Sequence, residues 1–143
     1  MRSIIEQNYE NYDVLYVDDA STDETKHTVE NIVKENNFDK IRVISNKENK
    51  KALHNICHCI AESKEDTIII LLDGDDWLSH RNVLAELNDI YDENVWITAG
   101  SYIDNLQGLI KKPEINASMW KSNIRKYSDT AGHNFSHLRT FRK

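Results

Sequence analysis

The sequence is poor in the residues that would place it outside the ordinary globular class. It has two cysteines, one proline and four glycines among 143 residues. Cys57 and Cys59 are two residues apart and poorly placed to bridge each other, so we expect no disulfide framework and, by default, a reducing compartment. The scarcity of glycine and proline argues against a repetitive or low-complexity chain.

Long apolar runs are also missing. No run approaches the ~20 residues that a transmembrane helix requires, and the first residues lack the apolar region of a signal peptide. We therefore expect a cytoplasmic chain with no transmembrane segment. The net charge of −6 argues against general binding to nucleic acid or acidic membranes, so no nucleic-acid partner is expected.

The chain is organised around an apolar run that leads into a group of acids. Residues 68–72 read Ile-Ile-Ile-Leu-Leu and are followed by Asp73-Gly74-Asp75-Asp76. This short run, rich in β-branched residues, predicts a strand buried on both faces, with carboxylates just past its carboxyl end, where open parallel sheets bind ligands. Close carboxylates repel unless a cation neutralises them, and oxygen ligands suit Mg²⁺ or Mn²⁺. The pattern therefore indicates a metal held against a phosphorylated substrate; a solvated acidic turn is the alternative.

A second strand repeats this arrangement. Residues 13–17 form a strand pattern that ends at Asp18 and Asp19. Ser21 and Glu24 have the spacing of a capping box, which predicts a helix beginning at Ser21. In one parallel sheet the two acidic ends would lie at the same edge. A sugar nucleotide would use both, one for its base or ribose and one for the metal on its diphosphate.

Alternating strand and helix patterns over residues 13–99 predict an α/β fold with a mostly parallel, Rossmann-like sheet flanked by helices. The expected strands are 13–17, 41–44, 68–72 and 95–99, and the expected helices are 1–7, 21–36, 52–62 and 78–91. Leu53 and Ile90 are expected to face the core. After residue 100 the pattern weakens and the tail becomes basic. There Arg139 and His137 are candidates for contact with phosphate oxygens, and a solvated end is the alternative.

Three motifs in order resemble those of the family 2 glycosyltransferases of GT-A fold. Residues 9–25 resemble the family's nucleotide-binding segment, residues 52–55 (Ala-Leu-His-Asn) its Ala-x-x-Asn helix, and residues 72–76 its Leu-Asp-x-Asp-Asp metal motif. The resemblance implies a GT-A nucleotide-sugar-binding region over residues 1–104. It implies a partial acceptor-side segment with a basic tail over residues 105–143.

The resemblance also implies roles for individual residues. Asp19 would meet uracil or an equivalent base, and Asp73 would lie near the ribose. The full set implied to bind the nucleotide is Asp18, Asp19, Ser21, Lys51, His54 and Asp73. Asp75 would be the main ligand of Mn²⁺ or Mg²⁺, and the implied metal set is Asp75, Asp73 and Asp76. The positions of Lys51 and His54 are the weaker transfer, because Asn49 replaces a glycine usual in that loop.

The activity implied is transfer of a sugar, with inversion, from a nucleotide-diphosphate sugar, UDP-sugar in the first place, to a hydroxyl. The acceptor would be a glycan, lipid-linked or protein hydroxyl in glycan biosynthesis. The family's base is an Asp, usually in a Glu-Asp pair beyond the metal motif. After residue 100 the acids are Asp104, Glu114 and Asp129, none in that pattern, so no catalytic residue is assigned.

The family further begins with a central strand and a Pro-x-Tyr-Asn-like loop, whereas this sequence opens at what resembles the following helix. We therefore expect a sheet without its first strand, and a fragment truncated at both ends that binds nucleotide weakly and turns over slowly or not at all. The alternative function is a non-catalytic sugar-nucleotide-binding remnant or interaction module. A nucleotidyltransferase is disfavoured, because its glycine-rich basic signature is absent.

Overall fold

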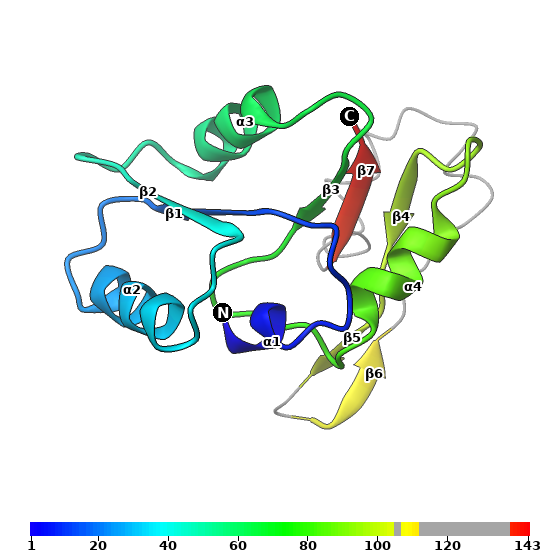
Figure 1. Cartoon of the computed structure of the whole chain (residues 1–143), viewed down its shortest axis with the longest axis horizontal. Coiled ribbons are helices and arrows are strands. Elements are labelled where there is room, and N and C mark those ends of the chain that lie inside the picture. Colours follow the sequence, from blue (N-terminus) through cyan, green and yellow to red (C-terminus); the bar gives the residue numbers. More distant parts are fainter. Residues whose placement is uncertain (105–106, 112–137) are drawn as a thin grey trace.

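The computed structural model describes residues 1–104, 107–111 and 138–143. Figure 1 shows the helices α1 (Arg2–Ile5), α2 (Thr25–Glu35), α3 (Ala52–Glu62) and α4 (Val83–Ile90). The strands are β1 (Val14–Asp18), β2 (Ile41–Ser45), β3 (Ile68–Leu71), β4 (Ile97–Ala99), β5 (Tyr102–Asp104), β6 (Leu109–Lys111) and β7 (Arg139–Arg142). Within these ranges, every helix is too short or too polar to cross a lipid bilayer.

The segment from β1 through α2 to β2 has the predicted order and connection. Strands β1 and β2 pair in parallel, with Val14 opposite Ile41 and Asp18 opposite Ser45, and α2 connects them. Parallel neighbours need such a crossover, because a tight hairpin can join only antiparallel strands. The unit confirms the prediction of alternating strands and helices and of a parallel pairing. It leaves Asp18 and the acid after it at the carboxyl end of β1.

Strand β3 does not join this parallel pair, and here the prediction of one continuous sheet is wrong for the described residues. β3 pairs with β7, which lies between β3 and β4 and runs antiparallel to both. Each residue of β3 is half-buried rather than buried on both faces. Among the described residues, no strand is hydrogen-bonded to both the β1–β2 pair and β3.

The buried core lies against α4. Leu78, Val83, Leu84 and Leu87 form its centre. Partly buried side chains from α1, β3 and the segments next to α1, β3 and β7 pack around it: Ile4, Tyr9, Tyr12, Ile70, Leu72 and Leu138. Burial of each such aliphatic side chain contributes about 1.5–3 kcal/mol, so this cluster holds the N-terminal turn, β3 and the start of β7 together.

Two helices begin later than the sequence predicts. α2 begins at Thr25 without a capping box, and the backbone N–H of Thr25 instead donates to Asp23 Oδ1 at 3.0 Å. α4 begins at Val83 rather than residue 78, and the N–H of Leu84 donates to Oε1 of the buried Gln7 at 3.1 Å. The orphan N–H groups of a helix's first turn need acceptors. For α4 one acceptor comes from 77 residues away in the sequence.

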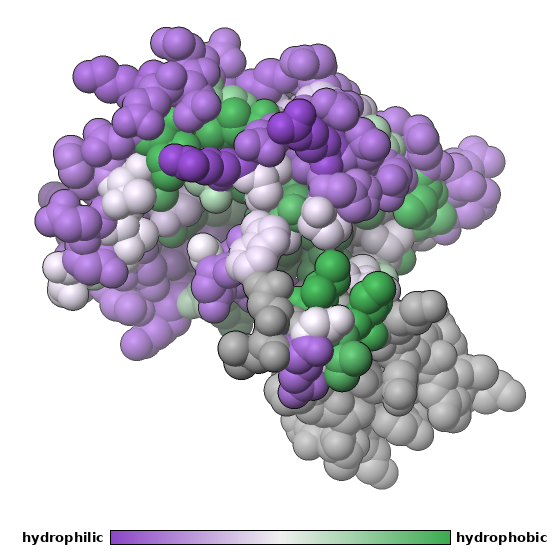
Figure 2. All heavy atoms as spheres, turned by 90° about the horizontal axis from the view of Figure 1, so that it is seen from below, coloured by the Kyte–Doolittle hydropathy of each residue, from purple (hydrophilic) through white to green (hydrophobic). Residues whose placement is uncertain are grey.

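Some apolar side chains predicted to face the core are exposed. Leu53 is 74% exposed and Ile90 is 51% exposed, so both predictions are wrong. Figure 2 also shows an apolar area on the face seen from below, at the β5–β6 hairpin, which lies at the bottom of Figure 1. Its exposed large side chains are Ile103, Leu109 and Ile110.

The end of the chain is structural. Thr140, in the middle of β7, is only 1% exposed. Its Oγ1 lies 2.7 Å from the hydroxyl of Tyr91 and 2.5 Å from Oγ1 of Thr98, which makes a chain of three hydroxyls inside the fold. The alternative of a solvated tail is therefore wrong for residues 138–143.

We expect Thr140→Val to lower the free energy of unfolding by about 1–3 kcal/mol, because it leaves the hydroxyls of Tyr91 and Thr98 without their shared partner. Thr140→Ser, which keeps the hydroxyl and loses one methyl group, should cost less. Urea unfolding followed by tryptophan fluorescence measures both. A Val variant as stable as the Ser variant would contradict the role given to the hydroxyl chain.

Candidate functional site

Asp19, directly after β1, anchors the loop that connects β2 to α3. Its Oδ1 accepts hydrogen bonds from Asn46 Nδ2 and from the backbone N–H of Lys50, both at 2.8 Å. Its Oδ2 accepts the backbone N–H of Lys51 at 2.9 Å. Asn46 Nδ2 also donates to Oδ1 of Asn55 on α3 at 2.9 Å. One carboxylate thus joins β1, the 46–51 loop and α3.

These donors stabilise the charged form of Asp19. The N–H of Lys50, followed by donors from Asn46, Asn55 and Lys51, lowers the pKa of Asp19 to about 2, against partial desolvation that raises it. An ionised carboxylate has about four acceptor positions. Three hydrogen bonds from described residues fix both oxygens, two at Oδ1 and one at Oδ2.

The loop has a strained residue where it meets Asp19. Lys51 has φ 73° and ψ 154°, a region occupied almost only by glycine. The residue immediately precedes α3, and its side chain is exposed. The two hydrogen bonds from its N–H, to Asp19 and to Asn49 Oδ1, hold it there.

The other residues predicted on this side lie around the same network. Asp18 is buried at the end of β1, and its Oδ1 accepts the backbone N–H of Ser21 at 3.4 Å. His54 is exposed in the first turn of α3. The structure therefore brings Asp18, Asp19, Ser21 and Lys51 to the carboxyl end of β1. Asp18 Oδ1, through its contact with the Ser21 N–H, helps to order the turn after β1.

The acidic turn follows β3. The backbone N–H of Asp76 donates to the carbonyl of Asp73 at 3.0 Å, which closes a tight turn through Gly74 and Asp75. Asp73 and Asp75 are exposed and Asp76 is half-buried. Because β3 and β1 belong to different sheets, the two acidic ends do not share one continuous sheet edge, and no hydrogen bond described here joins Asp19 to Asp73 or Asp75.

A basic side chain from β7 meets this turn. Arg139 Nη2 lies 3.6 Å from Asp73 Oδ1. The two residues are 66 positions apart, but the β3–β7 register places Arg139 opposite Leu71, two residues before Asp73. Arg139 was predicted only as a candidate for phosphate contact, and nothing in its local sequence linked it to the acidic turn. His137, the other such candidate, lies outside the residues that the structure describes.

The acids offer oxygen ligands of the kind that Mg²⁺ and Mn²⁺ prefer. Among the residues that the structure describes, no three His, Cys, Asp or Glu side chains come close enough to hold a metal by themselves, so Asp73, Asp75 and Asp76 do not form a closed cage. Mg²⁺ at phosphate-transfer sites is usually held by one or two carboxylates, with substrate phosphates completing the shell. The exposed Asp73 and Asp75 fit a site of that kind.

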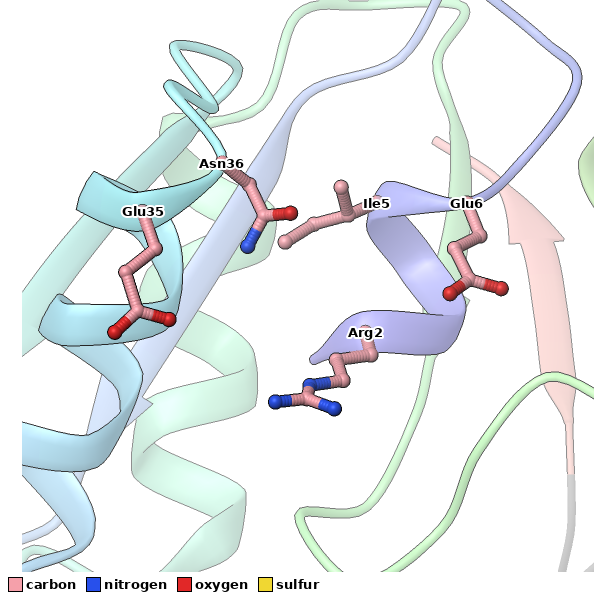
Figure 3. Close-up of a pocket in the computed structure, with 5 residues that line it drawn as sticks. All are labelled: Arg2, Ile5, Glu6, Glu35 and Asn36. Atoms are coloured by element: carbon pink, nitrogen blue, oxygen red, sulfur yellow. The ribbon is translucent and has the colours of Figure 1, made fainter.

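A hollow in the described part of the chain lies away from these residues. It has a volume of about 280 Å³ and is lined by Arg2, Ile5, Glu6, Glu35 and Asn36. Figure 3 shows Ile5 and Asn36 reaching toward each other between α1 and the end of α2, with Arg2 below them in this view. It holds none of the predicted site residues, and its open polar lining suits solvent better than a nucleotide.

Sequence reasoning missed Asn46. Its amide connects Asp19 to Asn55, and its N–H donates to the carbonyl of Asp18 at 2.9 Å. The available signal was Asn55 in the Ala-x-x-Asn motif: a buried-side asparagine at a helix start needs a partner. The only asparagines in the preceding loop are Asn46 and Asn49.

Comparison with known proteins adds independent information. The sequence model of the family described as Glycosyl transferase family 2 matches residues 1–143. A protein of Bacillus subtilis (strain 168) described as a glycosyltransferase, EpsE, is 36% identical over 76 residues, which are 53% of this chain and 27% of that protein. An uncharacterized glycosyltransferase of Haemophilus influenzae is 26% identical over 100 residues, 70% of this chain and 39% of that protein. The aligned part of this chain thus spans well under half the length of either relative.

We expect Lys51→Gly to raise the free energy of unfolding by about 1 kcal/mol, because release of the backbone strain outweighs the entropy cost of glycine. Lys50→Gly is the matched control: it keeps the N–H bond to Asp19, has no positive φ to relieve, and should lower stability. Thermal unfolding compares the two. Equal destabilisation by both variants would contradict the strain at Lys51.

The stability contributed by Asp19 should depend on pH. Its folded pKa of about 2 lies below the unfolded value of about 3.9, so its contribution is complete above about pH 4 and is lost as the pH falls toward 2. The difference in unfolding free energy between wild type and Asp19→Asn should therefore shrink over that range. A difference between wild type and Asp19→Asn that stays constant as the pH falls from about 4 to about 2 would contradict the assignment.

Proposed function

Since the chain belongs to glycosyltransferase family 2, whose GT-A α/β fold the sequence predicted, we propose that it binds a nucleotide-diphosphate sugar and supports transfer of the sugar to a hydroxyl. The proposed donor is a UDP-sugar. The proposed acceptor is a glycan, lipid-linked or protein hydroxyl, and the proposed outcome at the anomeric carbon is inversion.

The observation that carries the proposal is the set of hydrogen bonds that holds the Asp19 carboxylate in one orientation. Its two oxygens accept three hydrogen bonds from described residues, which fix their direction, and Oδ2 carries only one of the three. A uracil ring presents one N–H flanked by carbonyl oxygens, so it suits a fixed carboxylate position beside backbone donors. Because these donors keep Asp19 ionised well below neutral pH, it accepts and does not donate at working pH.

The acidic turn would meet the other end of the donor. Asp75, with Asp73 and Asp76 beside it, would hold Mn²⁺ or Mg²⁺. A bound divalent ion would neutralise the charge that develops on the diphosphate as it leaves. The chain's own contribution is to present exposed carboxylate oxygens on a turn that the Asp76 N–H to Asp73 carbonyl bond holds closed.

Inversion requires a single displacement. The acceptor oxygen forms its bond to the anomeric carbon as the bond from that carbon to the β-phosphate oxygen breaks, and the acceptor's proton passes to a base within hydrogen-bond reach. We assign no base within the described residues. Glu114 and Asp129 lie outside them.

Calorimetry with UDP tests the binding half of the proposal. Wild type should bind UDP with an affinity that rises on addition of Mn²⁺, and Asp75→Asn should remove at least tenfold of that gain, the effect of losing about 1.4 kcal/mol of metal-linked affinity. Asp89→Asn makes the same change in charge on α4 and should bind as wild type. Wild type that fails to bind UDP with Mn²⁺ would falsify the proposal.

Hydrolysis of the donor separates an enzyme from a non-catalytic binding module. Release of sugar from a UDP-sugar that is lost in Asp75→Asn supports catalysis by this chain. Metal-dependent UDP binding without hydrolysis of any UDP-sugar supports the non-catalytic alternative.

A further inference from the structure

Arg139 forms an ion pair with Asp73 of the acidic turn. It is the first residue of β7, and its partner Leu71 is the last residue of β3. The backbone of Arg139 therefore pairs with a strand on each side, with β3 at Leu71 and with β4 at Ala99, and this pairing fixes where the guanidinium starts. A group on the middle strand of a sheet is placed more reproducibly than one on a loop.

The contact with Asp73 does not satisfy this guanidinium. The Nη2–Oδ1 distance of 3.6 Å is longer than a hydrogen bond, and the two side chains are 40% and 58% exposed. Exposed ion pairs of this kind contribute ~0–1 kcal/mol. Nε of Arg139 is buried and has no hydrogen-bond partner among the described residues. A planar group with five N–H donors is thus held at the turn with at least its Nε–H unpaired among the described residues.

The negative charge of the turn would repel the diphosphate of the proposed ligand, so a nearby cation would favour binding. Asp73, Asp75 and Asp76 are three carboxylates within four residues, and a diphosphate would bring further negative charge to them. A divalent ion balances only part of that total. Arginine is the side chain whose fork matches phosphate oxygens in two parallel hydrogen bonds.

We propose that Arg139 is a binding residue for the diphosphate of the nucleotide, and that Asp73 holds it in position until the ligand arrives. The inference rests on the proposed function, since it names a further residue of the same site. On binding, the guanidinium exchanges its long contact with Asp73 for charge-assisted hydrogen bonds to phosphate oxygens. Asp73 is then released toward the metal or the ribose.

The test compares UDP, which has the diphosphate, with uridine, which lacks it. In the presence of Mn²⁺, Arg139→Gln should weaken UDP binding about tenfold to a hundredfold, the loss expected for charge-assisted hydrogen bonds. Its affinity for uridine, measured by NMR titration, should change less than twofold. Arg139→Lys keeps the charge without the fork and should fall between wild type and Arg139→Gln.

Arg142→Gln is the matched control. It makes the same change on the same strand, but Arg142 lies opposite Ile68 at the far end of β3 and donates to the carbonyl of Asp92 at 2.7 Å. It should leave both affinities unchanged, and thermal unfolding checks that each variant is folded. If Arg139→Gln does not fold, Arg139→Lys takes its place, and the inference then requires that its affinity for UDP falls more than its affinity for uridine.

Three outcomes overturn the inference. If the UDP affinity of Arg139→Gln is within twofold of that of Arg142→Gln, Arg139 does not contact the diphosphate. Equal weakening of UDP and uridine assigns Arg139 a structural role only. Wild type that binds uridine and UDP equally well overturns the diphosphate contact while leaving nucleoside binding in place, whereas wild type that binds neither overturns the proposed function itself.

Discussion

The backbone ladder between β3 and β7 is the interaction on which the rest of the described fold depends. β3 has no parallel neighbour among the described residues, so β7 supplies its hydrogen bonds and also those of β4. The same four residues of β7 carry Thr140 into the interior and Arg139 to the acidic turn. Each buried backbone group left unpaired would cost about 1–3 kcal/mol, a large part of a total stability of about 5–15 kcal/mol.

The carboxylates after β1 and those after β3 differ in how their negative charge is stabilised. Asp19 is surrounded by N–H donors, which stabilise its charge and fix its orientation before any ligand binds. Asp73 and Asp75 are exposed, where water screens their mutual repulsion, so the turn tolerates carboxylates close together without a bound cation. The proposed nucleotide would therefore meet a rigid half that recognises the base and an adaptable half that responds to charge.

Prediction from the sequence was most successful where the signal is local. The helix over residues 52–62 and the first two strands were correct to within one residue, because their apolar periodicity and their flanking polar residues lie in the same short window. It was wrong where a distant group intervenes. α4 begins where Gln7 can accept the Leu84 N–H, and Leu53 and Ile90 are exposed because no described element covers those faces of their helices.

The sequence by itself determined the α/β class, the family resemblance and the types of side chain at each strand end, since these depend on residues adjacent in the chain. Only the tertiary structure decided what those side chains do. Asp19 became an anchor because Asn46 and Lys50 fold back onto it, and Asp73 acquired a cation because β7 pairs in a register that sets Arg139 beside the end of β3. Hydrogen-bond direction and strand register are properties of groups that meet across space, and no local pattern encodes them.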